Sequence, residues 1–448
     1  MKSLRMLVLL LATLLAAGIP AAQAADVDLL IEKLVAKGVL TEDEGAALKS
    51  EMAQASVASA SASASTAVAV EDLGAVPVPA SAKPAAPSLM DRIALTGDFR
   101  FRYQTEDLDS GAASGLDGAA SGLDGAASGL DIDEQDRWRI RWRAGVVVDL
   151  SERWETGFGF ASGGTSARSS NQTLRRAFSR GDARLDYAYA KYQANDNVAV
   201  LTGKFKNPIW APKDLLWDGD IRPEGVALPM NFALNDRASL FVTPGYFILS
   251  ESVTDSRNDA NMLVFQAGAD FALSETVSLK LAPTYYGFSN LKGTGGPISL
   301  DIPSNSRDLN GDLINDYDAL AVGGQLTFTE LGVVPKLSVF GEWITAFDPS
   351  DDETGWLLGL SFGDAKISGF GDWQVKYNYR RLESDAWPEF LTDSDAFFGA
   401  TNVKGNELEF AWGVTKGVSL SLDYYSNFKF LGTDVEQDLL QLDLNIKW

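Results

Sequence analysis

Apolar and polar residues alternate along most of the chain from residue 92 onward. In residues 93–103 one face is apolar and the other carries Asp98, Arg100 and Arg102. Residues 137–150 alternate more strongly, with tryptophan, isoleucine, valine and leucine opposite four arginines. A period of two residues predicts β-strands that have one apolar and one polar face.

The alternation returns up to the C-terminus, where residues 440–448 end on Trp448. The alternation alone would also fit a soluble sandwich. The segments run to about ten residues or more, however, which is the length that tilted membrane strands require. We count about sixteen such strands. This is an even number, as closed bacterial barrels have. The pattern is weakest in residues 184–249, where Pro223, Pro229 and Pro244 interrupt it.

The connections between these segments alternate in length. Tight turns are expected at residues 151–153, 195–197, 235–237, 274–276 and 415–417, and long polar loops at 104–135, 163–182, 290–316 and 382–405. Such asymmetry is typical of a transmembrane, antiparallel, up-and-down β-barrel. We therefore predict an all-β barrel over residues 90–448, apolar outside and polar inside. Its location would be the outer membrane, with both termini on the periplasmic side.

The residues before the barrel have a different pattern. Lys2 and Arg5 precede an apolar stretch that ends in small residues, so 1–24 reads as a signal peptide. Residues 25–53 show helical spacing and predict a periplasmic helical hairpin or coiled-coil segment, and 54–89 an Ala/Ser/Pro linker. Such short helices need a partner. Other copies of the chain, the barrel mouth or the cell wall could supply one, and a frayed tether is the alternative.

Composition excludes several classes of protein. The chain has 448 residues, 46% of them hydrophobic, and a net charge of −23, which argues against binding nucleic acid. It contains no cysteine and no histidine, which excludes disulfides, thiolate or histidine metal ligands and serine–histidine catalytic pairs. We expect no enzyme activity and no cofactor.

Three short motifs follow one another near the middle of the chain. They are Leu-Thr-Gly-Lys-Phe-Lys-Asn-Pro at 201–208, Leu-Leu-Trp-Asp-Gly-Asp at 215–220 and Pro-Glu-Gly at 223–225. This series resembles the central motif of the putative porin family of Gram-negative outer membranes. The arginine-rich opening strands and Trp448 are similar to that family as well, so that the resemblance covers roughly residues 89–448.

The resemblance implies a porin similar to the general porins, which would pass ions and small hydrophilic solutes by diffusion through a water-filled channel. It would be surrounded by outer-membrane lipid, and we expect a homotrimer. The alternative is a narrow or closed barrel, a structural or adhesion protein that links the outer membrane to the cell wall or to a partner. About sixteen strands favour the channel, because a barrel of that size encloses water.

Basic side chains on the polar faces are candidates for lining the pore, where fixed positive charge would attract anions. These are Arg100, Arg102, Arg139, Arg141, Arg143, Lys204, Lys206, Lys376 and Arg380. Alternatively, carboxylates such as Asp98, Asp443, Glu407 and Glu409 neutralise them in ion pairs that brace the wall.

Residues 207–220 are a candidate constriction loop. If the loop folds inward, Asp214, Asp218 and Asp220 oppose the basic side chains and narrow the pore, as an infolded loop does in general porins. An ordinary surface loop is the alternative.

Two other loops have distinctive sequences. Gly-Ala-Ala-Ser-Gly-Leu-Asp occurs three times from Gly111, which lengthens a loop without forming a calcium-binding repeat. Asp308, Asn310 and Asp312 resemble the start of a calcium loop, but Leu313 stands where that loop needs glycine. We therefore predict no established metal site and keep these three residues as a weak calcium candidate.

Overall fold

The computed structural model describes residues 92–109, 135–175, 177–251, 259–298, 303–431 and 435–448. The expected signal peptide, helical segment, linker and threefold loop repeat lie outside these residues. Among the described residues no helix is long and apolar enough to cross a membrane.

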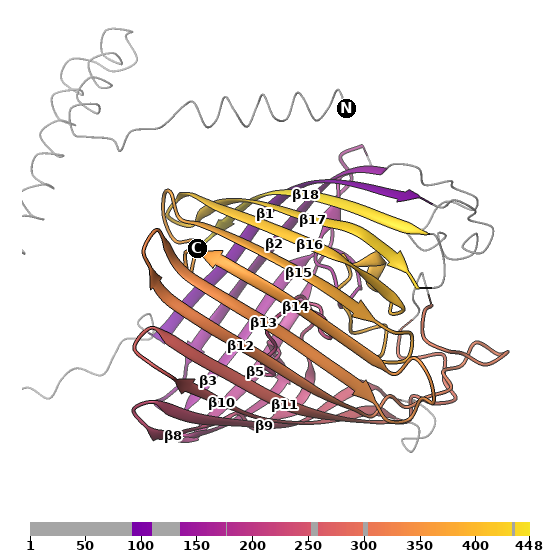
Figure 1. The fold of residues 1–448 in the computed structure, drawn as a ribbon, viewed down its shortest axis with the longest axis horizontal. Coiled ribbons are helices and arrows are strands. Elements are labelled where there is room, and N and C mark those ends of the chain that lie inside the picture. The colour runs from indigo at the N-terminus through magenta and orange to yellow at the C-terminus, as the bar shows by residue number, and fades with distance from the viewer. Residues whose placement is uncertain (1–91, 110–134, 176, 252–258, 299–302, 432–434) are drawn as a thin grey trace, which may run out of the picture. The chain divides into compact units, whose positions relative to one another are not determined.

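One antiparallel sheet closes on itself as a barrel of tilted strands (Figure 1). Its strands are β1 (Ile93–Asp109), β2 (Gln135–Asp149), β3 (Trp154–Ser162), β4 (Gln172–Thr173), β5 (Ala183–Asn195), β6 (Val198–Lys204), β7 (Glu224–Ala227), β8 (Met230–Asn235), β9 (Ala238–Ser250), β10 (Ala260–Ala272), β11 (Val277–Ser289), β12 (Ala319–Leu331), β13 (Val334–Ala346), β14 (Thr354–Gly363), β15 (Trp373–Leu382), β16 (Val403–Thr415), β17 (Val418–Phe430) and β18 (Glu436–Lys447). A short 3-10 element, η4 (Phe397–Gly399), precedes β16.

The barrel is closed because β1 pairs with both β2 and β18. β7 and β8 share one position between β6 and β9, since Pro229 lacks the N–H group that would continue a single strand. β4 is a two-residue segment that pairs only with β2. The wall therefore has 16 strand positions, and the predicted strand number is confirmed.

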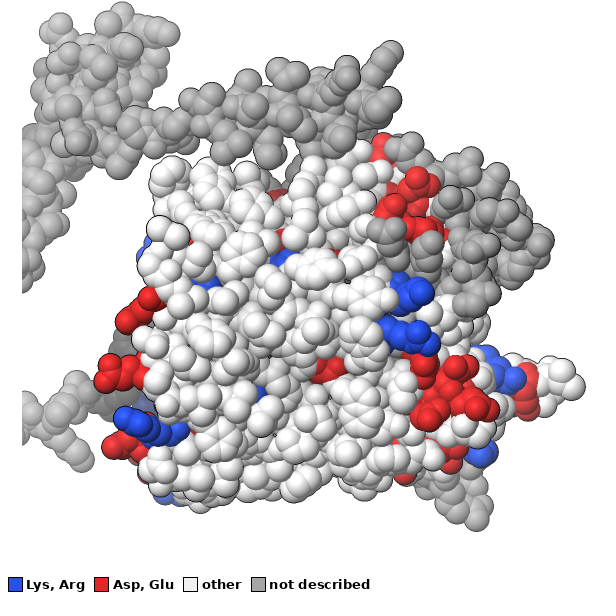
Figure 2. All heavy atoms as spheres, in the orientation of Figure 1, with Lys and Arg blue, Asp and Glu red and all other residues white. Residues whose placement is uncertain are grey.

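The apolar strand faces point outward. Leu263, Phe265, Val339 and Leu358 are between 42% and 58% exposed. Gln266 follows Phe265 on β10, points to the opposite face and is buried inside. Figure 2 shows an outer surface whose middle carries almost no charged side chains, while charges gather toward the two ends. An apolar band with charged rims is the surface that a bilayer requires.

The two rims differ as predicted. Tight turns such as those at residues 196–197, 236–237 and 416–417 lie at one rim, which we call the turn end. The long connections 163–182, 205–223 and 383–402 join strand ends on the other side of the barrel, the loop end. The two ends lie at the left and right of the barrel in Figure 1.

Part of the lumen is apolar, which differs from the polar interior that was expected. Phe247, Met262 and Tyr286 point inward from β9, β10 and β11 and belong to a buried cluster together with Leu216 and Trp217. These two residues come from the connection between β6 and β7. Strands that face another chain segment rather than water carry apolar residues on both faces.

Candidate functional site

The connection between β6 and β7, residues 205–223, lies inside the barrel, and we call it the inner loop. Gly203 and Gly225 face each other where the loop leaves and rejoins the wall. Gly203 has a φ of +108°, and a Cβ atom there would lie 2.4 Å from the Ala188 carbonyl oxygen. Only glycine fits this backbone. Phe205 and Leu216 anchor the loop in the apolar cluster, with 1% and 0% exposure.

Hydrogen bonds fix the first half of the inner loop to the wall. The Trp210 N–H donates to Gln266 Oε1 at 2.9 Å, and Gln266 Nε2 donates back to the Trp210 carbonyl at 2.8 Å. Pro212 and the Trp210 ring lie against Gly323 of β12, where an added Cβ atom would be 3.1 Å from Pro212 and 3.2 Å from the ring. The loop therefore follows the wall from β10 to β12 before it crosses toward β16.

Ion pairs fix the middle of the loop to β15 and β16. Lys213 Nζ lies 2.8 Å from Asp214, 2.9 Å from Glu407 and 2.7 Å from Glu409. Arg380 of β15 contacts Asp214 at 2.9 Å and also pairs with Glu407. Carboxylates thus neutralise both Lys213 and Arg380.

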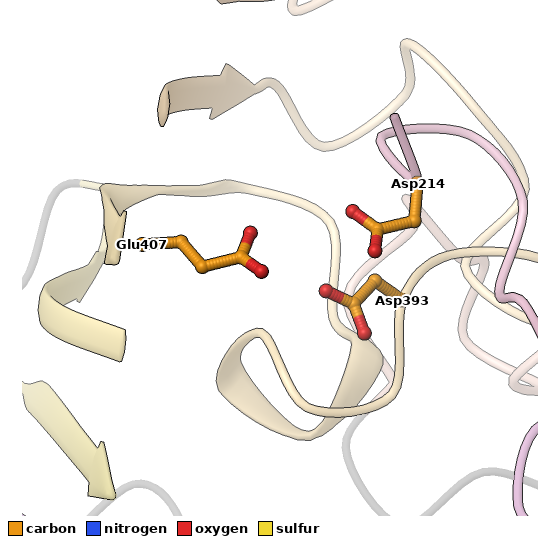
Figure 3. Close-up of side chains that lie close together, drawn as sticks. All are labelled: Asp214, Asp393 and Glu407. Carbon is orange, nitrogen blue, oxygen red and sulfur yellow. The ribbon is translucent and has the colours of Figure 1, made fainter. Parts of the chain in front are cut away.

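Two of these carboxylates, Asp214 and Glu407, converge with that of Asp393 (Figure 3). One oxygen atom each of Asp214, Asp393 and Glu407 lies within 4.8 Å of the others, the spacing of a possible metal site. Arg380 contacts all three residues, however, and its Asp393 contact measures 3.0 Å. A guanidinium already supplies the positive charge that a cation would bring, so the group is better described as an ion-pair cluster.

A second infolded segment, residues 383–402 between β15 and β16, packs on the inner loop. Trp387 is fully buried, and its Nε1 donates to the Leu216 carbonyl at 2.6 Å. The Asp218 N–H donates to the Leu391 carbonyl, and the Ser394 N–H donates to Asp218 Oδ2, both at 2.8 Å. Residues 382–405 were predicted to be a long polar loop. The apolar residues around Trp387 were the available signal for burial.

The predicted basic side chains of β1 and β2 lie inside the barrel, and carboxylates pair with most of them. Arg141 and Arg143 contact Asp98 of β1 at 3.0 and 2.8 Å. The same two arginines reach Asp220 of the inner loop, at 3.9 Å from Arg141 and 3.1 Å from Arg143. The inner loop and the basic wall are therefore in direct contact at this point.

The remaining arginines of this wall have neighbouring partners. Arg102 Nε lies 2.7 Å from Asp443 Oδ1. Arg100 donates to Asn171 at 2.6 Å and lies 3.6 Å from Asp443. Arg139 donates to Gln104 at 3.2 Å.

The predicted lysines have separate environments. Lys376 pairs with Glu409 at 2.9 Å, and Lys206 is exposed and lines a cavity at the turn end. Lys204 pairs with Glu224 at 2.6 Å, and both residues line a cavity together with Asp220.

Surroundings set the charge of the three predicted loop aspartates. Burial would raise the pKa of Asp214, but Lys213 and Arg380 lower it below its usual value. Arg141 and Arg143 likewise lower the pKa of the buried Asp220. For Asp218, burial and then the charge of Asp220 raise the pKa to about 7.

Three cavities follow one another along the β2–β5 side of the lumen. A loop-end cavity of about 390 Å³ includes Arg137, Arg139 and Arg168 in its lining. A middle cavity of about 340 Å³ shares Ser166 and Ser169 with it and includes Asp220. The middle cavity shares Asp186 and Arg222 with a turn-end cavity of about 540 Å³. These adjoining cavities therefore have several charged side chains in their lining.

Sequence reasoning did not select several of these side chains. Lys213 and Arg222 lie within the inner loop. Arg168 lies in the connection 163–182 and donates to the Glu389 and Gly399 carbonyls of the second infolded segment. Arg137 continues the alternation of the β2 arginines and could have been included on that signal alone.

The residues of the weak calcium candidate form a local turn. Asp308 is exposed, and its carboxylate accepts hydrogen bonds from the N–H groups of Asn310 and Asp312 at 2.8 and 3.0 Å. These contacts close a local turn. Asp308, Asn310 and Asp312 do not belong to the group of acidic residues with metal-site spacing found among the described residues.

Comparison with known proteins places this geometry in context. Residues 79–312 and 339–448 match the model of a family described as putative porin. Among solved structures, the high-pH form of OprB from Pseudomonas putida is similar, with 14% identity, a TM-score of 0.51, and coverage of 80% of this chain and 95% of that chain. A mutant porin of Rhodopseudomonas blastica has 12% identity and a TM-score of 0.40, with coverage of 80% of this chain and 100% of that chain. A comparison with curated proteins gave no match.

Proposed function

The chain belongs to the putative porin family, and we propose that its outer-membrane barrel passes ions and small hydrophilic solutes by diffusion. The observation that supports this most strongly is the inner loop, which contacts the basic wall of β1 and β2 in a charged part of the lumen. A narrowed passage lined by fixed charge selects solutes by size and charge. Channel formation requires no cofactor.

The ion pairs limit how strongly the basic wall favours anions. Asp98 and Asp220 neutralise part of the charge of Arg141 and Arg143, while Lys206 is exposed at the turn-end cavity. We expect a modest anion preference, because paired charges produce a weaker field in water than isolated ones. Within this proposal the arginines both brace the wall and set selectivity.

Planar bilayers test the channel directly. Stepwise conductance on insertion of the purified protein is the expected result. Electrically silent insertion at a matched protein dose would instead support the structural or adhesion alternative.

The proposal also includes a homotrimer, with the turn end and both termini in the periplasm. Native mass and the side on which surface-accessible labels react would test these two points.

The basic wall can be tested by selectivity. Replacing Arg139, Arg141 and Arg143 together with Gln should shift the reversal potential in a salt gradient toward cations. The same change at exposed Arg153, Arg180 and Arg237 is the matched control and should have little effect. An unchanged ion preference in the first variant would assign its arginines to wall bracing only.

A further inference from the structure

The Asp220 carboxylate is coordinated in the way that a bound solute anion would be. One of its oxygens, Oδ1, lies 3.1 Å from Arg143 Nη1 and 3.9 Å from Arg141 Nη1. The other, Oδ2, accepts hydrogen bonds from the Ser170 N–H at 3.0 Å and from the Ser170 hydroxyl at 2.9 Å. Two guanidinium groups, a backbone N–H and a hydroxyl are the donors that carboxylates and phosphates prefer.

These donors are positioned independently of Asp220. Asp98 of β1 contacts Arg141 at 3.0 Å and Arg143 at 2.8 Å from within the wall. The neighbouring Asn171 is bound to Arg100 of the wall at 2.6 Å, which fixes the segment that carries Ser170. The set of donors therefore stays in place if the Asp220 carboxylate moves away, and preorganised donors bind without a further ordering cost.

The location of the carboxylate gives this arrangement a role. Asp220 lines the middle cavity, which shares lining residues with both the loop-end and the turn-end cavities. Asp220 belongs to the inner loop, whereas its arginine partners belong to the wall. A solute that moved through the three adjoining cavities would pass this contact.

We propose that Arg141, Arg143 and Ser170 form a binding site for solutes that carry a carboxylate or phosphate group, and that Asp220 is an internal ligand which such a solute displaces. The inference rests on the proposed channel function and adds a solute class to it. A tethered competitor acts at a high effective concentration, so solutes bind weakly and leave quickly. Rapid release suits a transport site, because tight binding would block the passage.

Equilibrium binding to the detergent-solubilised full chain tests the site without any measurement of transport. Calorimetric titrations with inorganic phosphate and with acetate compare the wild type with Asp220→Ala. Removing the competitor should tighten binding of at least one anion by roughly tenfold or more, since charge-assisted hydrogen bonds are lost from the competing state. The anion that gains more identifies the preferred solute class.

Controls separate the site from general charge effects. Asp308→Ala removes one exposed carboxylate elsewhere and should bind both anions as the wild type does. Adding Arg143→Gln to Asp220→Ala should abolish the gain. If Asp220→Ala does not fold, Asp220→Asn replaces it, because the amide oxygen can still accept from Ser170 without carrying charge.

Unchanged affinity for both anions in the folded Asp220 variant would overturn the inference, as would a gain that survives Arg143→Gln. Neither result depends on conductance. Conversely, absence of conductance in bilayers would contradict the proposed channel while the binding data stand on their own.

Discussion

At the residue scale, the aspartates of the inner loop show how neighbours determine charge. Asp214 and Asp220 lie against cationic side chains and have lowered pKa values, whereas Asp218 is buried beside Asp220 and has a pKa raised to about 7. Asp218 also joins the two infolded segments through Leu391 and Ser394. Its protonation therefore affects how firmly they pack.

We predict that the contact between the infolded segments is more stable at pH 6 than at pH 8. A folded pKa above the unfolded value means that the folded state binds more protons between about pH 4 and 7, so this residue's contribution to stability falls as pH rises through that window. Hydrogen exchange of residues 214–221, compared with Asp218→Asn at each pH, measures the effect. Equal protection ratios at both pH values would contradict it.

At the element scale, the second infolded segment is held by aromatic packing. The Trp387 ring centroid lies 4.6 Å from that of Tyr286, 5.4 Å from that of Phe288 and 6.2 Å from that of Trp217. Trp387 thus joins the segment 383–402 to β11 and to the inner loop at once. The proposed narrow passage would depend on this packing as well as on ion pairs.

We predict that Trp387→Ala loosens both segments and increases single-channel conductance. Truncation of a buried tryptophan costs about 3–5 kcal/mol, which is enough to release a loop while the barrel stays closed. Conductance and protease cleavage within residues 383–402 are the measurements. Trp154→Ala, at an outward-facing position near the turn end, is the control and should change neither.

At the scale of the whole molecule, the barrel exposes apolar side chains on its outer surface, which requires contact with hydrocarbon. Val339 lies near the middle of β13 and is 42% exposed on the outer face, whereas Val333 in the adjoining tight turn is 93% exposed. Two valines therefore lie at different distances from the end of the barrel on neighbouring parts of one hairpin. This offers a direct test of the membrane position.

We predict that Val339→Arg destabilises the barrel folded in lipid vesicles by about 2–4 kcal/mol, the cost of an arginine near the bilayer midplane. Val333→Arg should cost about 0–1 kcal/mol, because a rim position reaches water. Denaturant titration in vesicles measures both. Equal destabilisation by the two substitutions would place the membrane elsewhere on the molecule.

The sequence by itself determined the barrel, its strand number, the inward arginines of β1 and β2 and the alternation of turns and loops. Each of these depends on period-two patterning or on turn residues, which are local properties of the chain.

Only the tertiary structure decided that residues 383–402 pack inside, that part of the lumen is apolar, and that Asp220 contacts Arg141 and Arg143. These contacts join segments far apart in the chain. The apolar residues around Trp387 indicate burial, but they do not reveal the segment that buries them. Polar loop residues such as Asp220 look alike in a sequence whether they contact water or the wall, because their partners are fixed only when the barrel closes.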